Sequence, residues 1–157
     1  MRTCVAFRDI RGLAESAVLD AADAVAQAKR PPVIADLAAG SAPYLLRTLA
    51  ALPARPDVVV ELGLYGIYHD DRRIERHFAD LAELVAPRQI VFNVQTQNPE
   101  IEYIARVWRN AAGAPCVWRL RPVGQILGYA AAAGYAPVSE TADRHGIYRV
   151  VRLERRA

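Results

Sequence analysis

Three short apolar runs, each followed by a turn and a helical pattern, most constrain what this chain can fold into. The runs are residues 33–37, 57–62 and 89–94. Each is too short for an ordinary helix and shows little polar alternation, which is typical of strands buried on both faces. Strands that alternate with helices predict a mostly parallel sheet with helices on both faces.

Helical patterns fill the segments between these runs. Apolar side chains recur every three or four residues over 13–29 and over 70–85, which predicts one buried face in each helix. Asp70 and Asp71 suit the start of the second helix, where acidic side chains cap free amides. Residues 63–68 are predicted to be a loop. Further helices are predicted over 43–50, 100–111 and 123–133.

The end of the chain departs from this alternation. Strands are predicted over 116–120, 136–141 and 147–153. Gly134 and Gly146 turn the chain between short strands, which indicates an antiparallel pair at one edge of the sheet. The chain has 157 residues, a length that fits one domain, so we expect a single α/β domain over 1–157.

Composition argues against several classes of protein. The formal net charge is only +3 and the basic residues are scattered, so we expect no nucleic-acid partner. Cys4 and Cys116 provide neither a disulfide framework nor metal-ligand spacing, so no metal is expected. No apolar run approaches the roughly 20 residues of a membrane helix. Charges interrupt residues 1–30, so a cytoplasmic protein is expected.

Candidate ligand-binding loops follow the three predicted parallel strands, at 36–43, 61–69 and 93–99. Open α/β sheets bind ligands beyond the carboxyl ends of their strands. The first loop joins Asp36 to a turn of small residues around Gly40, where a ligand can approach the backbone closely. The alternative interpretation is a tight connection between a strand and a helix.

The second and third loops carry different chemistry. Tyr65, Tyr68 and His69 suit stacking on a flat ligand and proton transfer. The alternative is that the two tyrosines pack over the end of the sheet. The amides of Gln95 and Gln97 suit hydrogen bonds to a polar substrate. The alternative for this loop is a solvated turn that caps the next helix.

The run Val-Ile-Ala-Asp-Leu-Ala-Ala-Gly at 33–40 resembles the first motif of class I S-adenosylmethionine-dependent methyltransferases. Within that superfamily the chain is similar to a group of bacterial methyltransferases, some of which are joined to an α/β-hydrolase domain. The resemblance extends from about Arg8 to Arg156. It includes Arg8 to Arg11, Gly63 to Tyr65, Gln95, Pro99, 104–107, Val117, Arg119, Arg121, Gly134, Tyr135 and 146–148.

This resemblance implies both an activity and a site. The expected activity is methyl transfer from S-adenosylmethionine, the implied cofactor, to a small or lipid-like acceptor. The implied cofactor-binding residues are Asp36, Ala38, Gly40, Ser41, Glu61 and Gly63. The implied catalytic residues are Tyr65 and His69, with His69 as the candidate general base. The implied substrate-binding residues are Tyr68, Gln95 and Gln97.

The chain is shorter than the family between its first two predicted strands. The family places two further strands and their helices where this chain has only residues 38–56. The resemblance therefore implies a shortened Rossmann-like methyltransferase sheet of five to six strands, mostly parallel with an antiparallel C-terminal strand. Residues 44–56 contain no acid for the ribose hydroxyls, so the alternative function is a non-catalytic, methyltransferase-like binding or scaffold protein.

The same shortening makes the 33–37 strand an edge of the sheet. An exposed apolar edge strand invites pairing with another chain, and Val33 to Ala35 carry no charge to prevent it. We therefore expect a homodimer that covers this edge.

Overall fold

The computed structural model describes residues 2–26, 31–37, 55–110 and 112–157, which form a five-stranded sheet in the order β1-β2-β3-β5-β4. The strands are β1 (Ile34–Asp36), β2 (Val58–Glu61), β3 (Gln89–Gln95), β4 (Tyr135–Ala142) and β5 (Tyr148–Arg155). Strands β1, β2 and β3 are parallel, whereas β5 is antiparallel to both β3 and β4. The predicted α/β fold with an antiparallel C-terminal strand is confirmed, and β1 is at an edge of the described sheet.

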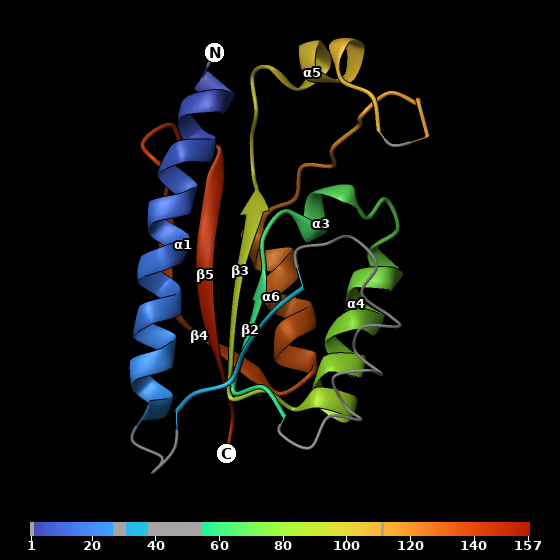
Figure 1. Cartoon of the computed structure of the whole chain (residues 1–157). Coiled ribbons are helices and arrows are strands. Elements are labelled where there is room, and N and C mark those ends of the chain that lie inside the picture. The colour runs from blue at the N-terminus through green and yellow to red at the C-terminus, as the bar shows by residue number, and fades with distance from the viewer. Residues whose placement is uncertain (1, 27–30, 38–54, 111) are drawn as a thin grey trace.

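Helices cover both faces of the sheet. The α-helices of the described residues are α1 (Arg2–Ala26), α3 (Leu64–Ile67), α4 (Asp71–Asp80), α5 (Ile101–Val107) and α6 (Val123–Ala132). Figure 1 shows α1 along one face and α4 with α6 on the other. Alternate side chains of β2 explain this arrangement, because Val58 and Val60 pack with the α1 residues whereas Val59 packs with those of α4 and α6. No helix within the described ranges is long and apolar enough to cross a membrane.

Helix α1 begins at Arg2, far ahead of the predicted start at residue 13. The prediction was wrong there because Ala6, Ile10 and Ala14 continue the apolar stripe at a spacing of four, and all three are buried. The last predicted residues of this helix, 27–29, lie outside the described residues. The predicted helix over 43–50 lies outside them as well.

The predicted strand over 116–120 is wrong, because this described segment pairs with no strand. The side of β3 away from β2 is already occupied by β5, so a sixth strand finds no partner there. The segment instead crosses the carboxyl end of the sheet. Its backbone is held there by hydrogen bonds from Arg119 N to Gly66 O at 2.8 Å and from Arg121 N to Gln95 O at 3.1 Å.

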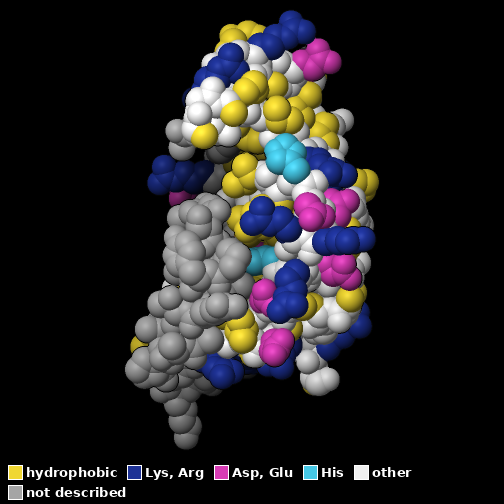
Figure 2. Space-filling view, turned by 90° about the vertical axis from the view of Figure 1, so that its right-hand side faces the viewer, with side chains coloured by type: hydrophobic (Ala, Val, Ile, Leu, Met, Phe, Trp, Pro, Cys, Tyr) yellow, Lys and Arg dark blue, Asp and Glu magenta, His cyan; other side chains and the backbone are white. Residues whose placement is uncertain are grey.

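Two other predicted segments differ in detail. The predicted loop over 63–68 contains the short helix α3. The predicted helix over 70–85 divides into α4 and a π-helical turn, Leu81–Val85, which ends at Ala86 with a φ of 54°. The expected cap is present, because the Asp70 side chain accepts a hydrogen bond from Arg72 N at 3.0 Å. Figure 2 shows basic and acidic side chains mixed over the face that bears α4, with hydrophobic side chains gathered above it.

Candidate functional site

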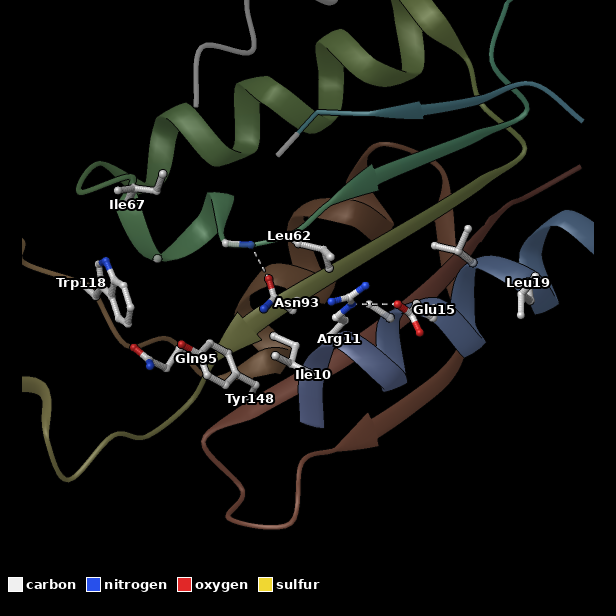
Figure 3. A pocket seen from close by; sticks show the side chains of 14 residues that line it. Ile10, Arg11, Glu15, Leu19, Leu62, Ile67, Asn93, Gln95, Trp118 and Tyr148 are labelled. Carbon is white, nitrogen blue, oxygen red and sulfur yellow. Dashed lines mark hydrogen bonds and ion pairs between the residues drawn. The ribbon is translucent and has the colours of Figure 1, made fainter. Parts of the chain in front are cut away.

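A groove of about 960 Å³ opens at the carboxyl ends of β2 and β3 (Figure 3), and this volume falls within the range of small-molecule sites. One wall is the helix α1, and the other is α3 with the segment that carries Trp118. The lining residues are Ile10, Arg11, Ala14, Glu15, Val18, Leu19, Leu62, Gly63, Gly66, Ile67, Asn93, Gln95, Trp118 and Tyr148.

The walls of the groove are predominantly apolar. Among the described residues of the lining, Arg11 and Glu15 are the only charged ones, and they form an ion pair with each other at 3.0 Å on the exposed side of α1. Trp118 and Tyr148 add aromatic rings to the lining. The part of the lining that the structure describes therefore suits an apolar molecule and presents no unpaired charge to it.

Two neutral amide side chains from β3 form the floor. Asn93 and Gln95 are two residues apart, so both face the α1 side of the sheet, and each is only 3% exposed. Asn93 Oδ1 accepts a hydrogen bond from Gly63 N at 2.5 Å. Among the described residues, neither Oε1 nor Nε2 of Gln95 has a hydrogen-bond partner. Such orphaned buried groups are rare in folded proteins and require an explanation.

Gly63 connects the end of β2 to α3 at the edge of the groove. Its φ of 82° lies in the left-handed region, which glycine adopts without steric cost. A Cβ atom built on Gly63 would meet no heavy atom within 4 Å, so its free side faces open space. The hydrogen bond to Asn93 fixes this backbone, which lies beside the floor of the groove.

Glu61 and Tyr65, two residues of the predicted site, lie behind the groove on the other side of the sheet. Both are fully buried, and the Tyr65 hydroxyl donates a hydrogen bond to Glu61 Oε2. Burial, followed by the negative charge of Glu61, raises the pKa of Tyr65 well above its usual value. The Tyr65 hydroxyl therefore stays protonated at neutral pH and serves as a donor to Glu61.

His77 completes this buried cluster, and sequence reasoning did not single it out as part of the site. Its Nε2 lies 2.5 Å from Glu61 Oε1, and its side chain is almost fully buried. The signal was its position between Ile74 and Phe78 on the apolar face of α4, where a solvated polar residue is not expected.

The other predicted residues of the second and third loops do not line the groove. Tyr68 is buried in the core beneath the Arg73 guanidinium, which lies 5.0 Å from its ring centre. His69 is exposed, and its carbonyl accepts a hydrogen bond from the Arg119 side chain. Gln97 is exposed and donates from Nε2 to the carbonyl of His145 at 3.4 Å. The structure thus brings Gly63 and Gln95 together at the groove and keeps these three residues outside it.

The predicted residues near the first strand are only partly described. Asp36 ends β1 at the carboxyl edge of the sheet and is exposed. Ala38, Gly40 and Ser41 lie outside the described residues. In the part of the chain that is described, no group of three or more His, Cys, Asp or Glu side chains could hold a metal ion.

Arg121 holds the loop between α3 and α4 in place, a role that the sequence alone did not indicate. Its buried guanidinium donates hydrogen bonds to the carbonyls of Tyr65 and Tyr68 and, at 2.8 Å, to Asp71 Oδ1. A guanidinium presents five donors in a rigid fork, so one side chain can satisfy several acceptors. Arg121 therefore fixes the elements that form one wall of the groove.

Comparison with known proteins gives a family match over nearly the whole chain. The model of a family described as "Putative methyltransferase" matches residues 4–156. The uncharacterized protein YnbC of Escherichia coli (strain K12) is 30% identical over 110 residues, which are 69% of this chain. The chain spans 19% of the length of that relative. The family match confirms the resemblance predicted from the sequence.

Solved structures share the fold at low sequence identity. Magnesium protoporphyrin IX methyltransferase from Synechocystis PCC 6803, with bound S-adenosylhomocysteine, aligns with a TM-score of 0.58 and 16% identity. The alignment covers 94% of this chain and 85% of that chain. A structure described as a possible exported protein from Bordetella parapertussis aligns with a TM-score of 0.52 and 17% identity, over 69% of this chain and 42% of that chain.

Proposed function

The chain belongs to this methyltransferase family, and we propose that it transfers a methyl group from S-adenosylmethionine to a small acceptor bound in the groove. The observation that carries the proposal is the position of the groove at the carboxyl ends of β2 and β3. Open α/β sheets bind their ligands at this edge. A solved methyltransferase that aligns over most of both chains holds S-adenosylhomocysteine, which supports the cofactor as well as the fold.

The described residues at this edge fit the cofactor. Asp36 places a carboxylate at the end of β1, and Gly63 leaves open space at the end of β2. We assign both to the cofactor, together with Ala38, Gly40 and Ser41 from the turn that the sequence singled out. Glu61 supports this edge from behind, through its contacts with Tyr65 and His77. The bound cofactor would supply a methyl group already activated on its sulfonium sulfur.

The residues of the groove bind and orient the acceptor. Apolar walls exclude water from the bound molecule, and Asn93 with Gln95 present hydrogen-bonding groups at the floor. Holding two reactants in a productive geometry supplies a large part of the rate enhancement when one of them is already activated. We therefore propose proximity and orientation as the main catalytic contribution of the chain.

The described part of the lining offers no strong general base. Its ionisable members are Arg11, Glu15 and Tyr148, and burial followed by the charge of Asp143 raises the pKa of Tyr148 far above neutrality. Glu15 is exposed and paired with Arg11. His69, the base predicted from the sequence, remains a candidate that a His69→Asn variant tests. Unchanged methyl transfer in that variant would remove His69 from the mechanism.

Calorimetric titration with S-adenosylmethionine and S-adenosylhomocysteine tests the proposal. We expect micromolar binding that Asp36→Ala weakens strongly. Asp23→Ala, which removes an exposed carboxylate of α1, is the matched control and should bind as the wild type does. No heat at millimolar cofactor from a folded sample would overturn the proposal and would favour the non-catalytic scaffold function instead.

A further inference from the structure

The polar side chains at the floor of the groove indicate which kind of molecule the groove binds. Gln95 is 3% exposed, and among the described residues neither of its side-chain polar atoms has a partner. A buried amide that gives up its bonds to water without replacing them destabilises the folded protein. A ligand that forms hydrogen bonds with both atoms would restore the stability that is lost. The Gln95 carboxamide is therefore a candidate contact for the ligand.

The surroundings of Gln95 indicate the shape of this ligand. In Figure 3 its side chain lies between the rings of Trp118 and Tyr148, which line the same groove. Aromatic side chains pack well against flat, apolar molecules. A planar molecule that lies along the Trp118 ring would bring one of its edges to the carboxamide.

The charged residues of the groove indicate that the ligand carries no net charge. Arg11 and Glu15 satisfy each other, and Asn93 and Gln95 are neutral. A charged group that entered the apolar interior would lose its hydration and gain no counter-ion from the described residues of the lining. The polar groups of the ligand are therefore uncharged.

We propose that the groove binds a flat, uncharged, largely apolar acceptor that carries a hydrogen-bond donor beside a carbonyl, as a lactam does. The donor would meet Gln95 Oε1 and the carbonyl would meet Nε2, because a carboxamide presents an acceptor and a donor side by side. This inference deepens the proposed function, since it names the chemical class of the methyl acceptor. Its binding test is independent of methyl transfer.

Three probes of similar size test the proposal by calorimetry on the full chain without cofactor. Carbostyril, a bicyclic lactam, has both groups, whereas N-methylcarbostyril lacks the donor and quinaldate carries a negative charge. We expect carbostyril to bind at least about tenfold more tightly than its N-methyl derivative, which is the effect of one well-placed hydrogen bond. We expect no binding of quinaldate at the same concentrations.

Two variants test whether the Gln95 side chain causes the difference between the two lactam affinities. Gln95→Met removes the amide at similar volume and should reduce the ratio of the two lactam affinities to about one. Gln97→Met makes the same change at an exposed residue outside the lining and should leave the ratio unchanged. The melting temperature of Gln95→Met should equal or exceed that of the wild type, because the variant removes two orphaned polar atoms.

The results separate this inference from the proposed function. Equal affinities of wild-type protein for the two lactams, tight binding of quinaldate, or no carbostyril binding would each overturn the inference. Binding of S-adenosylhomocysteine without binding of carbostyril would leave the proposed function intact. Discrimination between the lactams without any cofactor binding would support the recognition site and contradict the proposed activity.

Discussion

His77 and Glu61 meet in the interior of the protein, where His77 Nε2 lies 2.5 Å from Glu61 Oε1. The other carboxylate oxygen of Glu61 accepts the hydrogen bond of Tyr65. This cluster joins the end of β2 to α4 and to α3. The cluster therefore supports, from the other side of the sheet, the end of β2 and the helix α3 that border the groove.

The His77–Glu61 pair should make stability depend on pH. Burial opposes the charge on His77, but the charge of Glu61 and the hydrogen bond to it prevail, so the pKa of His77 is raised above 6.5. A histidine of this kind stabilises the folded state fully below its unfolded pKa, and the contribution is lost as the pH rises through the folded pKa. As the pH rises from below 6.5 through the folded pKa of His77, we expect the free energy of unfolding in urea to fall more steeply in the wild type than in His77→Gln.

His69→Gln is the matched control for this experiment. It makes the same substitution at an exposed histidine, and its stability profile should follow that of the wild type. Parallel profiles for the wild type and His77→Gln would contradict the assignment of the pH dependence to the buried pair.

Arg121 should be far more important for stability than its neighbour Arg119. Replacing Arg121 by Met leaves two carbonyls without their donor and removes a buried partner of Asp71. We expect a loss of about 3 kcal/mol or more in chemical denaturation. Arg119→Met removes a half-exposed guanidinium 3.6 Å from Asp71 and should cost no more than about 1 kcal/mol. Similar losses in the two variants would refute the proposed role of Arg121.

Gly63 and Gly66 should respond differently to alanine, although both line the groove. Gly63 has a φ of 82°, whereas Gly66 lies within α3 and has no positive φ. We expect Gly63→Ala to destabilise the protein by about 1–2 kcal/mol, because alanine is strained in the left-handed region. Gly66→Ala should be neutral or slightly stabilising, since alanine favours helix. Thermal and urea unfolding measure both effects, and an equal loss in the two variants would contradict this explanation.

The exposed edge of the sheet should mediate a homodimer. Ile34 of β1 is 45% exposed, and β1 has no strand on its outer side among the described residues. The opposite edge strand, β4, carries Pro137 and a register shift next to it, features that discourage pairing between chains. We expect light scattering to show a dimer at micromolar concentrations and a monomer for Ile34→Lys.

Val138→Lys provides the control at the opposite edge. Val138 lies on β4 and is as exposed as Ile34, so the charge is added to a comparable edge position. This variant should remain dimeric. A wild-type monomer, or loss of the dimer in both variants, would exclude assembly through β1.

The strands β2 and β3 could be predicted from the sequence to within a residue or two. Both strands are buried along their whole length, and each contains an apolar run, Val58 to Val60 and Ile90 to Phe92, a local property that survives in any parallel sheet covered by helices. The antiparallel end of the sheet was also predictable, because Gly146 turns the chain between β4 and β5. Nothing in the sequence of residues 116–120 excluded the sixth strand that was predicted there. Only the tertiary structure shows that β5 takes the place beside β3 and that residues 116–120 lie across the carboxyl end of the sheet.

The candidate site, like the fold, was predictable where it depends on local sequence and not where it depends on contacts between distant segments. Sequence alone determined which loops follow the parallel strands, and it selected Gly63 and Gln95, both of which line the groove. Tertiary structure alone decided that Glu61 lies behind it, because successive residues of a strand face opposite sides and the sequence does not state which side α1 covers. Tyr65 of α3 joins Glu61 there through its hydrogen bond. His77 and Arg121 acquire their roles through partners far away in the chain. Such contacts depend on the packing of separate elements and are not encoded in any local pattern.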